Sequence, residues 1–172
     1  MKIFFAVIVV LLFFKVLNLF SSSDRLKVGD IAPDFKLSDA NGIYYTLSSF
    51  KDKTPVVIYF YPKANTPGCT KQACGIRDDW SKFEKENIPV FGISVDSRES
   101  IREFVEKYSL NFPLLSDESK TVSKAYGVLS PLGFSKRVTF IIDKEGKIAH
   151  ILEKVDVNTH SKEVFDLAVK LK

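Results

Sequence analysis

Runs of apolar residues alternate along the chain with segments whose apolar positions follow helical spacing. Two runs, residues 55–61 and 90–95, are apolar, β-branched or aromatic almost throughout. That composition is typical of parallel strands buried on both faces. Each run is followed by a segment of helical spacing, at 69–86 and at 97–108. The order strand, helix, strand, helix predicts an α/β domain.

Hairpins are expected on both sides of this central pattern. Asn41-Gly42 separates short apolar runs at 35–37 and 44–47, and this dipeptide is the strongest short-range hairpin signal. A second antiparallel hairpin is expected where a turn ending at Gly146 joins two further runs. The strands of this second hairpin are expected at 138–142 and 148–152. The remaining predicted elements are an extended segment at 112–115, a short helix at 118–126 and an amphipathic helix from Thr159 onward. Together they predict a mixed sheet flanked by helices on both faces, with an N-terminal β-hairpin.

The first 23 residues differ from the rest of the chain. They contain no Asp or Glu, two lysines, and twelve unbroken apolar residues from Ile3 to Phe14. Such a run fits the apolar region of a secretory signal, about 7–15 residues, better than a bilayer span of about 20. Retention as a membrane anchor through residues 3–20 is the main alternative, and a buried core helix is a weaker one. We therefore expect a signal peptide or membrane anchor at 1–23, one folded domain at 24–172, and export to a periplasmic or other extracytoplasmic location.

Composition and charge exclude several classes of protein. The chain has 172 residues, of which 45% are hydrophobic and 27% charged, which excludes intrinsic disorder. Two cysteines cannot make a disulfide-stapled scaffold. Residues 24–172 contain 23 basic and 21 acidic side chains, so their net charge is close to zero. No nucleic-acid partner is therefore expected.

Cys69 is a candidate nucleophile. It follows a predicted strand and the Pro/Gly-rich loop 63–68, at the expected first turn of a helix. Unpaired backbone N–H groups and the positive end of the helix dipole favour the thiolate there, and the thiolate is the reactive form. The turn-forming residues around Cys69 place it near a surface, which argues against the alternative of an inert, buried small hydrophobe.

The second cysteine, Cys74, lies five positions later. On an intact helix the two Cα atoms would be about 8.6 Å apart, beyond the limit of roughly 7 Å for a disulfide, so the pair could close only if the first turns unwound. His150 and His160 lack the spacing of a metal site, and no metal is expected. A Cys–His hydrolase would need His160, with Asn158, brought beside the first thiol.

The segment 59–78 resembles the active-site segment of the peroxiredoxins, specifically the bacterioferritin comigratory protein or peroxiredoxin Q subfamily. The family pattern of Pro, three residues, Thr, two residues and Cys is matched by Pro62, Thr66 and Cys69. Cys74 matches the resolving cysteine of the subfamily. Further similar segments lie at 28–35, 114–117 and 137–143, so the resemblance covers the chain from about residue 27.

This resemblance implies a thioredoxin-like fold and a thiol-dependent peroxidase that reduces hydrogen peroxide and organic hydroperoxides. In the family pattern Cys69 attacks the peroxide and becomes a sulfenic acid. Thr66 supplies a hydroxyl, Arg137 stabilises the thiolate and the developing charge, and Pro62 shields the pocket from water. Cys74 then forms an intramolecular disulfide with Cys69, which a thioredoxin-like reductant reduces without any bound cofactor. The implied protein is a monomer that serves antioxidant defence and redox homeostasis.

Two other functions are compatible with parts of the sequence. An exported thioredoxin-like thiol–disulfide oxidoreductase would combine a leader with this fold, but that class uses C-x-x-C. Four residues separate the cysteines here, which favours peroxide reduction. A thiol chaperone or structural domain with an inert Cys69 is the non-enzymatic alternative, and it would not consume peroxide.

Overall fold

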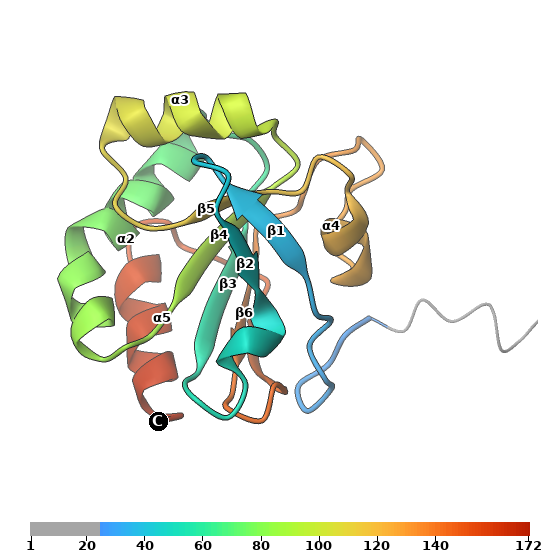
Figure 1. Ribbon diagram of the computed structural model, residues 1–172, viewed down its shortest axis with the longest axis vertical. Helices are drawn as coiled ribbons and strands as arrows, with labels where there is room; N and C mark the ends of the chain where they lie inside the picture. Colours follow the sequence, from blue (N-terminus) through green and yellow to red (C-terminus); the bar gives the residue numbers. More distant parts are fainter. Residues whose placement is uncertain (1–24) are drawn as a thin grey trace, which may run out of the picture.

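A seven-stranded mixed sheet forms the centre of the computed structural model, which describes residues 25–172 (Figure 1). The strands follow the order β2-β1-β5-β4-β3-β6-β7. Their bounds are β1 (Lys36–Asp39), β2 (Tyr44–Thr46), β3 (Val56–Phe60), β4 (Val90–Ser94), β5 (Leu114–Ser116), β6 (Val138–Ile142) and β7 (Ile148–Leu152). Neighbours β3, β4 and β5 run parallel and the other pairs antiparallel, so the predicted mixed sheet is confirmed.

The strand β3 shows why the pattern of the sequence led to the right sheet. All five of its side chains are buried. Val57 and Tyr59 belong to the hydrophobic cluster on one face, and Ile58 and Phe60 to the cluster on the other. A strand covered on both faces has no solvent side, which is why its sequence is apolar throughout rather than alternating.

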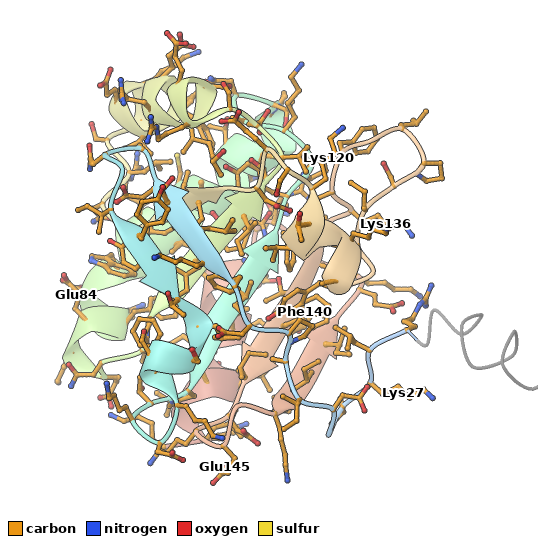
Figure 2. All side chains as sticks on the ribbon, turned by 45° about the vertical axis from the view of Figure 1, so that its right-hand side comes forward. Lys27, Glu84, Lys120, Lys136, Phe140 and Glu145 are labelled. Carbon is orange, nitrogen blue, oxygen red and sulfur yellow. The ribbon has the colours of Figure 1, made fainter. Side chains whose placement is uncertain are left out.

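Helices cover both faces of the sheet, as predicted (Figure 1). Their bounds are η1 (Leu47–Phe50), α2 (Pro67–Lys85), α3 (Arg98–Tyr108), α4 (Thr121–Ala125) and α5 (His160–Val169). Buried residues of α2, α3 and α5 share one cluster, whereas Val122 of α4 lies in the opposite one. Phe140 points into the interior beneath α4, while Glu84, Lys120 and Glu145 point outward (Figure 2).

Local features of the sequence determine where α2 begins and where it ends. Pro67 occupies the first helical position, where its missing N–H costs nothing. At the other end Asn87 takes a left-handed φ of 50°, and the Ile88 N–H donates to the Phe83 carbonyl at 2.9 Å. This 6→1 hydrogen bond is the Schellman arrangement, which satisfies a terminal carbonyl and stops the helix.

Several predicted boundaries differ from the observed ones by one to three residues, including those of α4 and β2. The helix expected at 118–126 begins only at Thr121, because Lys120 adopts a left-handed φ of 61°. The buried Asp117 carboxylate accepts the N–H groups of Val122 and Ser123 at 3.3 and 2.7 Å, which organises the helix start from outside it. The strand expected to reach residue 47 stops at Thr46, where η1 begins.

The predicted signal or anchor, residues 1–23, lies outside the described part of the chain. Between residues 25 and 172, none of the helices combines the length and the apolar character that crossing a membrane requires.

Candidate active site

Cys69 is the third residue of α2, directly beyond the carboxyl end of β3. Its side chain is buried, with 2% of its surface exposed, among Tyr59, Tyr61 and Ala73. The prediction that it lies near a surface was therefore wrong for the side chain. The turn residues around it do face solvent, but the third position of the helix points beneath the first turn, toward the sheet.

Arg137 is the charged partner of this thiol. Its Nη2 donates to Cys69 Sγ at 3.3 Å, and its Nη1 donates to the Oε1 of Gln72, one turn along α2. The residue directly precedes β6, and Val138 of β6 pairs with Phe60 of β3, so antiparallel pairing brings Arg137 to the edge of the sheet where α2 starts. A fixed guanidinium at this distance can stabilise negative charge that develops on the sulfur.

The glycine at the second helical position allows this approach. A Cβ on Gly68 would lie 3.2 Å from Arg137 Nη2. That separation is tight for a carbon, so the guanidinium would have to shift by a few tenths of an ångström. Gly68 therefore keeps the backbone of the first turn close to the cation.

Thr66 and Pro62 lie at the two ends of the loop between β3 and α2. Thr66 is the N-cap residue, yet its hydroxyl makes no capping bond and donates to the Lys63 carbonyl at 2.9 Å. Because its single proton is engaged, the oxygen can only accept a hydrogen bond from a further partner. Pro62 is half-buried, two positions beyond Phe60, the last residue of β3.

The same loop is fastened to the neighbouring strand. The N–H of Ala64 donates to the Asp96 carboxylate at 2.8 Å, and the Ser94 hydroxyl donates to the same oxygen at 2.8 Å. Asn65, next in the loop, takes a left-handed φ of 59°. These contacts hold the loop beside the first turn of α2.

Cys74 lies farther along α2 and is half-buried against the same cluster that contains Cys69. Both residues are free thiols on one unbroken helix. This arrangement agrees with the expectation that the pair stays open while the helix is intact.

Residues 28–151 match the AhpC/TSA family. The chain belongs to this family. Peroxiredoxin Bcp of Escherichia coli (strain K12) is 44% identical over 142 residues, which span 78% of this chain and 90% of the relative. A chloroplastic peroxiredoxin Q of Oryza sativa subsp. japonica is 46% identical over 129 residues, 74% of this chain and 59% of the relative.

Solved structures agree with this membership. The crystal structure of peroxidoxin BcpB from Mycobacterium tuberculosis is 35% identical with a TM-score of 0.78, covering 86% of this chain and 99% of that one. The crystal structure of a Xylella fastidiosa PrxQ mutant is 29% identical with a TM-score of 0.78, covering 84% and 96%. The predicted resemblance and fold are confirmed, and this peroxiredoxin is a thiol-dependent peroxidase.

Sequence reasoning missed Gln72 and Thr139, which lie behind the guanidinium of this peroxiredoxin, and it missed that His160 joins them there. Gln72, Thr139 and His160 are buried, each with 1% or less of its surface exposed. The His160 ring contacts the other two rather than the thiol, so the Cys–His arrangement considered above does not form. Only the position of Gln72, three residues after Cys69, was a local signal. Across residues 25–172, no three His, Cys, Asp or Glu side chains gather as metal ligands.

His160 is neutral in this environment. Burial, with a smaller effect from the positive charge of Arg137, lowers the pKa of His160 to about 4. The ring therefore offers one nitrogen as an acceptor and one N–H as a donor.

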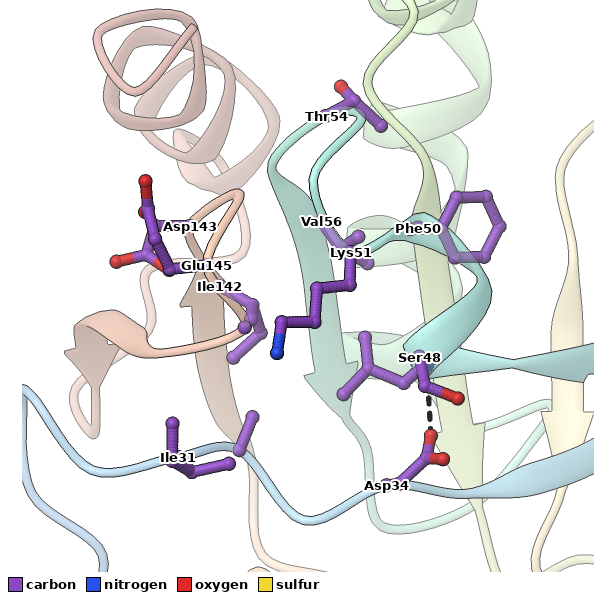
Figure 3. A pocket seen from close by; sticks show the side chains of 13 residues that line it. Ile31, Asp34, Ser48, Phe50, Lys51, Thr54, Val56, Ile142, Asp143 and Glu145 are labelled. Carbon is purple, nitrogen blue, oxygen red and sulfur yellow. Dashed lines mark hydrogen bonds between the residues drawn. The ribbon is translucent and has the colours of Figure 1, made fainter.

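An apolar hollow lies at the opposite end of the sheet (Figure 3). It holds about 200 Å³, with the Lys51 side chain reaching across it and the Asp34 carboxylate accepting the Ser48 N–H at 2.9 Å. Val56, the first residue of β3, lines it, whereas Cys69 follows the last. None of the predicted site residues lines this hollow, so it is not the peroxide site.

Proposed function

We propose that Cys69 is the peroxidatic residue of this thiol peroxidase and that Cys74 resolves it. The contact of Arg137 with Cys69 Sγ at 3.3 Å carries this assignment, because it supplies a cation to the one thiol at the start of α2. The Cys69 thiolate attacks one oxygen of a hydroperoxide, a sulfur–oxygen bond forms and the O–O bond breaks. The sulfur gives up two electrons and becomes a sulfenic acid. The other oxygen of the peroxide leaves as an alkoxide or hydroxide and takes up a proton to form an alcohol or water.

Three groups position the peroxide in this mechanism. The Thr66 oxygen accepts a hydrogen bond from the peroxide, since its own proton is already donated to a carbonyl. The Arg137 guanidinium and the Cys69 N–H donate to the oxygens where negative charge develops. Pro62, at the start of the loop, shields the thiolate from water.

Cys74 completes the cycle on the same chain. Its thiol attacks the sulfenic sulfur, an S–S bond forms and water leaves, after the first turns of α2 have unwound. A thioredoxin-like dithiol then reduces the disulfide by exchange. No bound cofactor or metal takes part, and the intramolecular bridge allows a monomer to act alone.

Matched serine variants test the two roles. Cys69→Ser abolishes consumption of hydrogen peroxide and of an organic hydroperoxide, measured with a thioredoxin system as the reductant. Cys74→Ser completes one turnover and then stalls or over-oxidises, which mass spectrometry detects as added oxygen on residue 69. Full activity in Cys69→Ser would contradict the assignment. Disulfide reduction without peroxide consumption would instead support the thiol–disulfide oxidoreductase alternative.

The leader gives this peroxidase an extracytoplasmic location. Residues 1–23 act as a cleaved signal or as a retained tether through residues 3–20, and residues 24–172 form the catalytic domain. Support comes from the apolar run with Lys2 before it, and the family match begins only at residue 28. Mass spectrometry of the native N-terminus, with fractionation of cells, tests this location. Analytical ultracentrifugation of the reduced protein tests whether it is a monomer.

A further inference from the structure

We propose that His160 is a positioning residue that aims Arg137 at Cys69 through Gln72. The inference rests on the proposed role of Cys69. The Gln72 Nε2 lies 3.2 Å from His160 Nδ1 and 3.4 Å from Nε2, and the Thr139 hydroxyl lies 2.8 Å from His160 Nε2. The imidazole is fully buried, so water cannot replace these contacts.

Donor and acceptor chemistry gives this chain of contacts one direction. Arg137 can only donate, so the Gln72 carbonyl oxygen must face it and the Gln72 amide nitrogen must face the ring. An amide nitrogen also only donates, so the ring nitrogen that faces it must be unprotonated, and we assign this role to the nearer one, Nδ1 of His160. The proton of the neutral ring is then on Nε2, which donates to the Thr139 oxygen. A neutral His160 is thus what keeps the Gln72 amide in the orientation that Arg137 requires.

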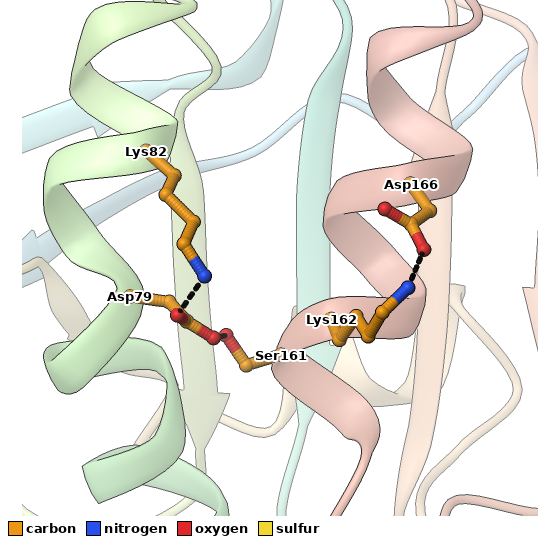
Figure 4. Close-up of polar contacts among 5 residues, drawn as sticks. All are labelled: Asp79, Lys82, Ser161, Lys162 and Asp166. Atoms are coloured by element: carbon orange, nitrogen blue, oxygen red, sulfur yellow. Dashed lines mark hydrogen bonds and ion pairs between the residues drawn. The ribbon is translucent and has the colours of Figure 1, made fainter.

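The ring is held by elements on three sides. Gln72 lies on α2 and Thr139 on β6, and the Tyr59 ring of β3 meets the imidazole edge-on at 5.6 Å. The next residue, Ser161, donates to the Asp79 carboxylate at 2.8 Å and so fastens the start of α5 to α2 (Figure 4). A side chain fixed in this way can transmit its position to a neighbour without touching the peroxide.

Loss of the ring acceptor has a specific consequence for the sulfur. A Gln72 amide with no acceptor for its nitrogen is free to rotate, and the rotated amide would turn an N–H toward the guanidinium. Two donors repel, so Arg137 would shift away from Cys69 Sγ. The thiolate would lose part of its stabilisation, and the first oxidation would slow.

Three variants in a Cys74→Ser background separate this effect from general damage. His160→Leu removes the acceptor, whereas His160→Asn places an amide oxygen near the position of Nδ1. His150→Leu is the matched control, because the other histidine of the chain lies half-buried on β7, outside this network. The readouts are the single-turnover rate with hydrogen peroxide and the pH profile of Cys69 alkylation by iodoacetamide.

We expect His160→Leu to slow the first oxidation roughly tenfold or more, since small displacements of a catalytic group are costly, and to move the alkylation profile to higher pH. His160→Asn should recover most of the rate and restore the profile, and His150→Leu should match the parent. A folded His160→Leu protein with the parent rate and profile would overturn the proposal. The proposal would also be overturned if His160→Asn were as impaired as His160→Leu, because the loss of rate would then come from altered packing and not from a lost hydrogen bond.

Thr139→Val keeps the test decisive if His160→Leu does not fold. This substitution removes the acceptor of the Nε2 proton at nearly constant side-chain volume. We expect the alkylation profile of Cys69 to move to higher pH, by less than in His160→Leu. An unchanged alkylation profile would overturn the proposal. Cys69→Ser distinguishes the two levels of inference. If that variant keeps peroxidase activity the proposed function fails, whereas an inactive Cys69→Ser beside a normal His160→Leu leaves the function standing and refutes only the positioning role.

Discussion

The stability of the reduced protein should fall as the pH is lowered from 7 to 4, and His160 should account for a measurable share of that fall. Its pKa is lowered to about 4, first by burial and then by the charge of Arg137. The groups that face the ring are Gln72, Thr139, Tyr59 and the same guanidinium. None of them offers an anion to a protonated imidazole.

The size of the effect follows from the difference between the two states. A histidine in the unfolded chain takes up a proton below a pKa of about 6.5, whereas the folded chain resists until about 4. Between these values the unfolded state binds more protons, so the free energy of unfolding rises with pH. The contribution of His160 is complete above pH 6.5 and is lost as the pH falls toward 4. Linkage gives a loss of about 2 kcal/mol at pH 5 and about 3 kcal/mol at pH 4.

Urea unfolding of reduced wild type, His160→Asn and His150→Asn at pH 7, 5 and 4 measures this loss. Carboxylates also titrate in this range. One is Asp79, whose pKa is lowered mainly by its hydrogen bond from Lys82, but it is present in all three proteins and cancels in the difference. The stability advantage of wild type over His160→Asn should shrink by about 2 kcal/mol between pH 7 and pH 5. The His150 control should run parallel to wild type. An advantage that stays constant across this range would refute the reasoning.

Four further substitutions have expected outcomes. Arg137→Lys should slow the first oxidation of Cys69 by on the order of 10²-fold in stopped flow, because an ammonium cannot span two acceptors as the guanidinium fork does. The buried Tyr59 hydroxyl has no hydrogen-bond partner in the described domain, so Tyr59→Phe should raise the free energy of unfolding by about 1 kcal/mol. Tyr126→Phe should lower it by about 1 kcal/mol, because it removes a 2.8 Å hydrogen bond to a backbone carbonyl. The same sign for both in urea titrations would contradict this. Gly92→Ala should cost about 1–3 kcal/mol in the same assay, since its Cβ would lie 2.6 Å from the Tyr59 hydroxyl.

Local patterns in the sequence were sufficient for most of the sheet and for the two thiols. The apolar segment 55–61 could be assigned because burial on both faces leaves an unambiguous composition. The start of α4 could not, because Lys120 in a left-handed conformation and a buried Asp117 are not visible as a period. The resemblance to peroxiredoxins led to Arg137, since no spacing argument relates it to Cys69.

The contacts behind Arg137 were out of reach for a physical reason. Gln72 and His160 are separated by 88 positions, and their contact depends on how α5 packs against α2. Taken alone, a histidine near the C-terminus has no feature that distinguishes a buried hydrogen-bonding ring from an exposed one. Burial of the Cys69 side chain was missed in the same way, because turn residues report on the backbone around a position and not on where its side chain points.

Gln72 lies between the two cysteines, so the proposed cycle makes opposing demands on one segment. While α2 is intact, Gln72 contacts both Arg137 and His160, and Arg137 contacts the Sγ of Cys69. Bringing Cys74 to the oxidised sulfur requires the first turns to unwind, which must pull Gln72 away from both partners. In the proposed cycle, peroxide reduction and disulfide formation therefore use mutually exclusive conformations of the start of α2. A peroxidase of this design needs that segment stable enough to hold the reactive site and weak enough to open once the sulfur is oxidised.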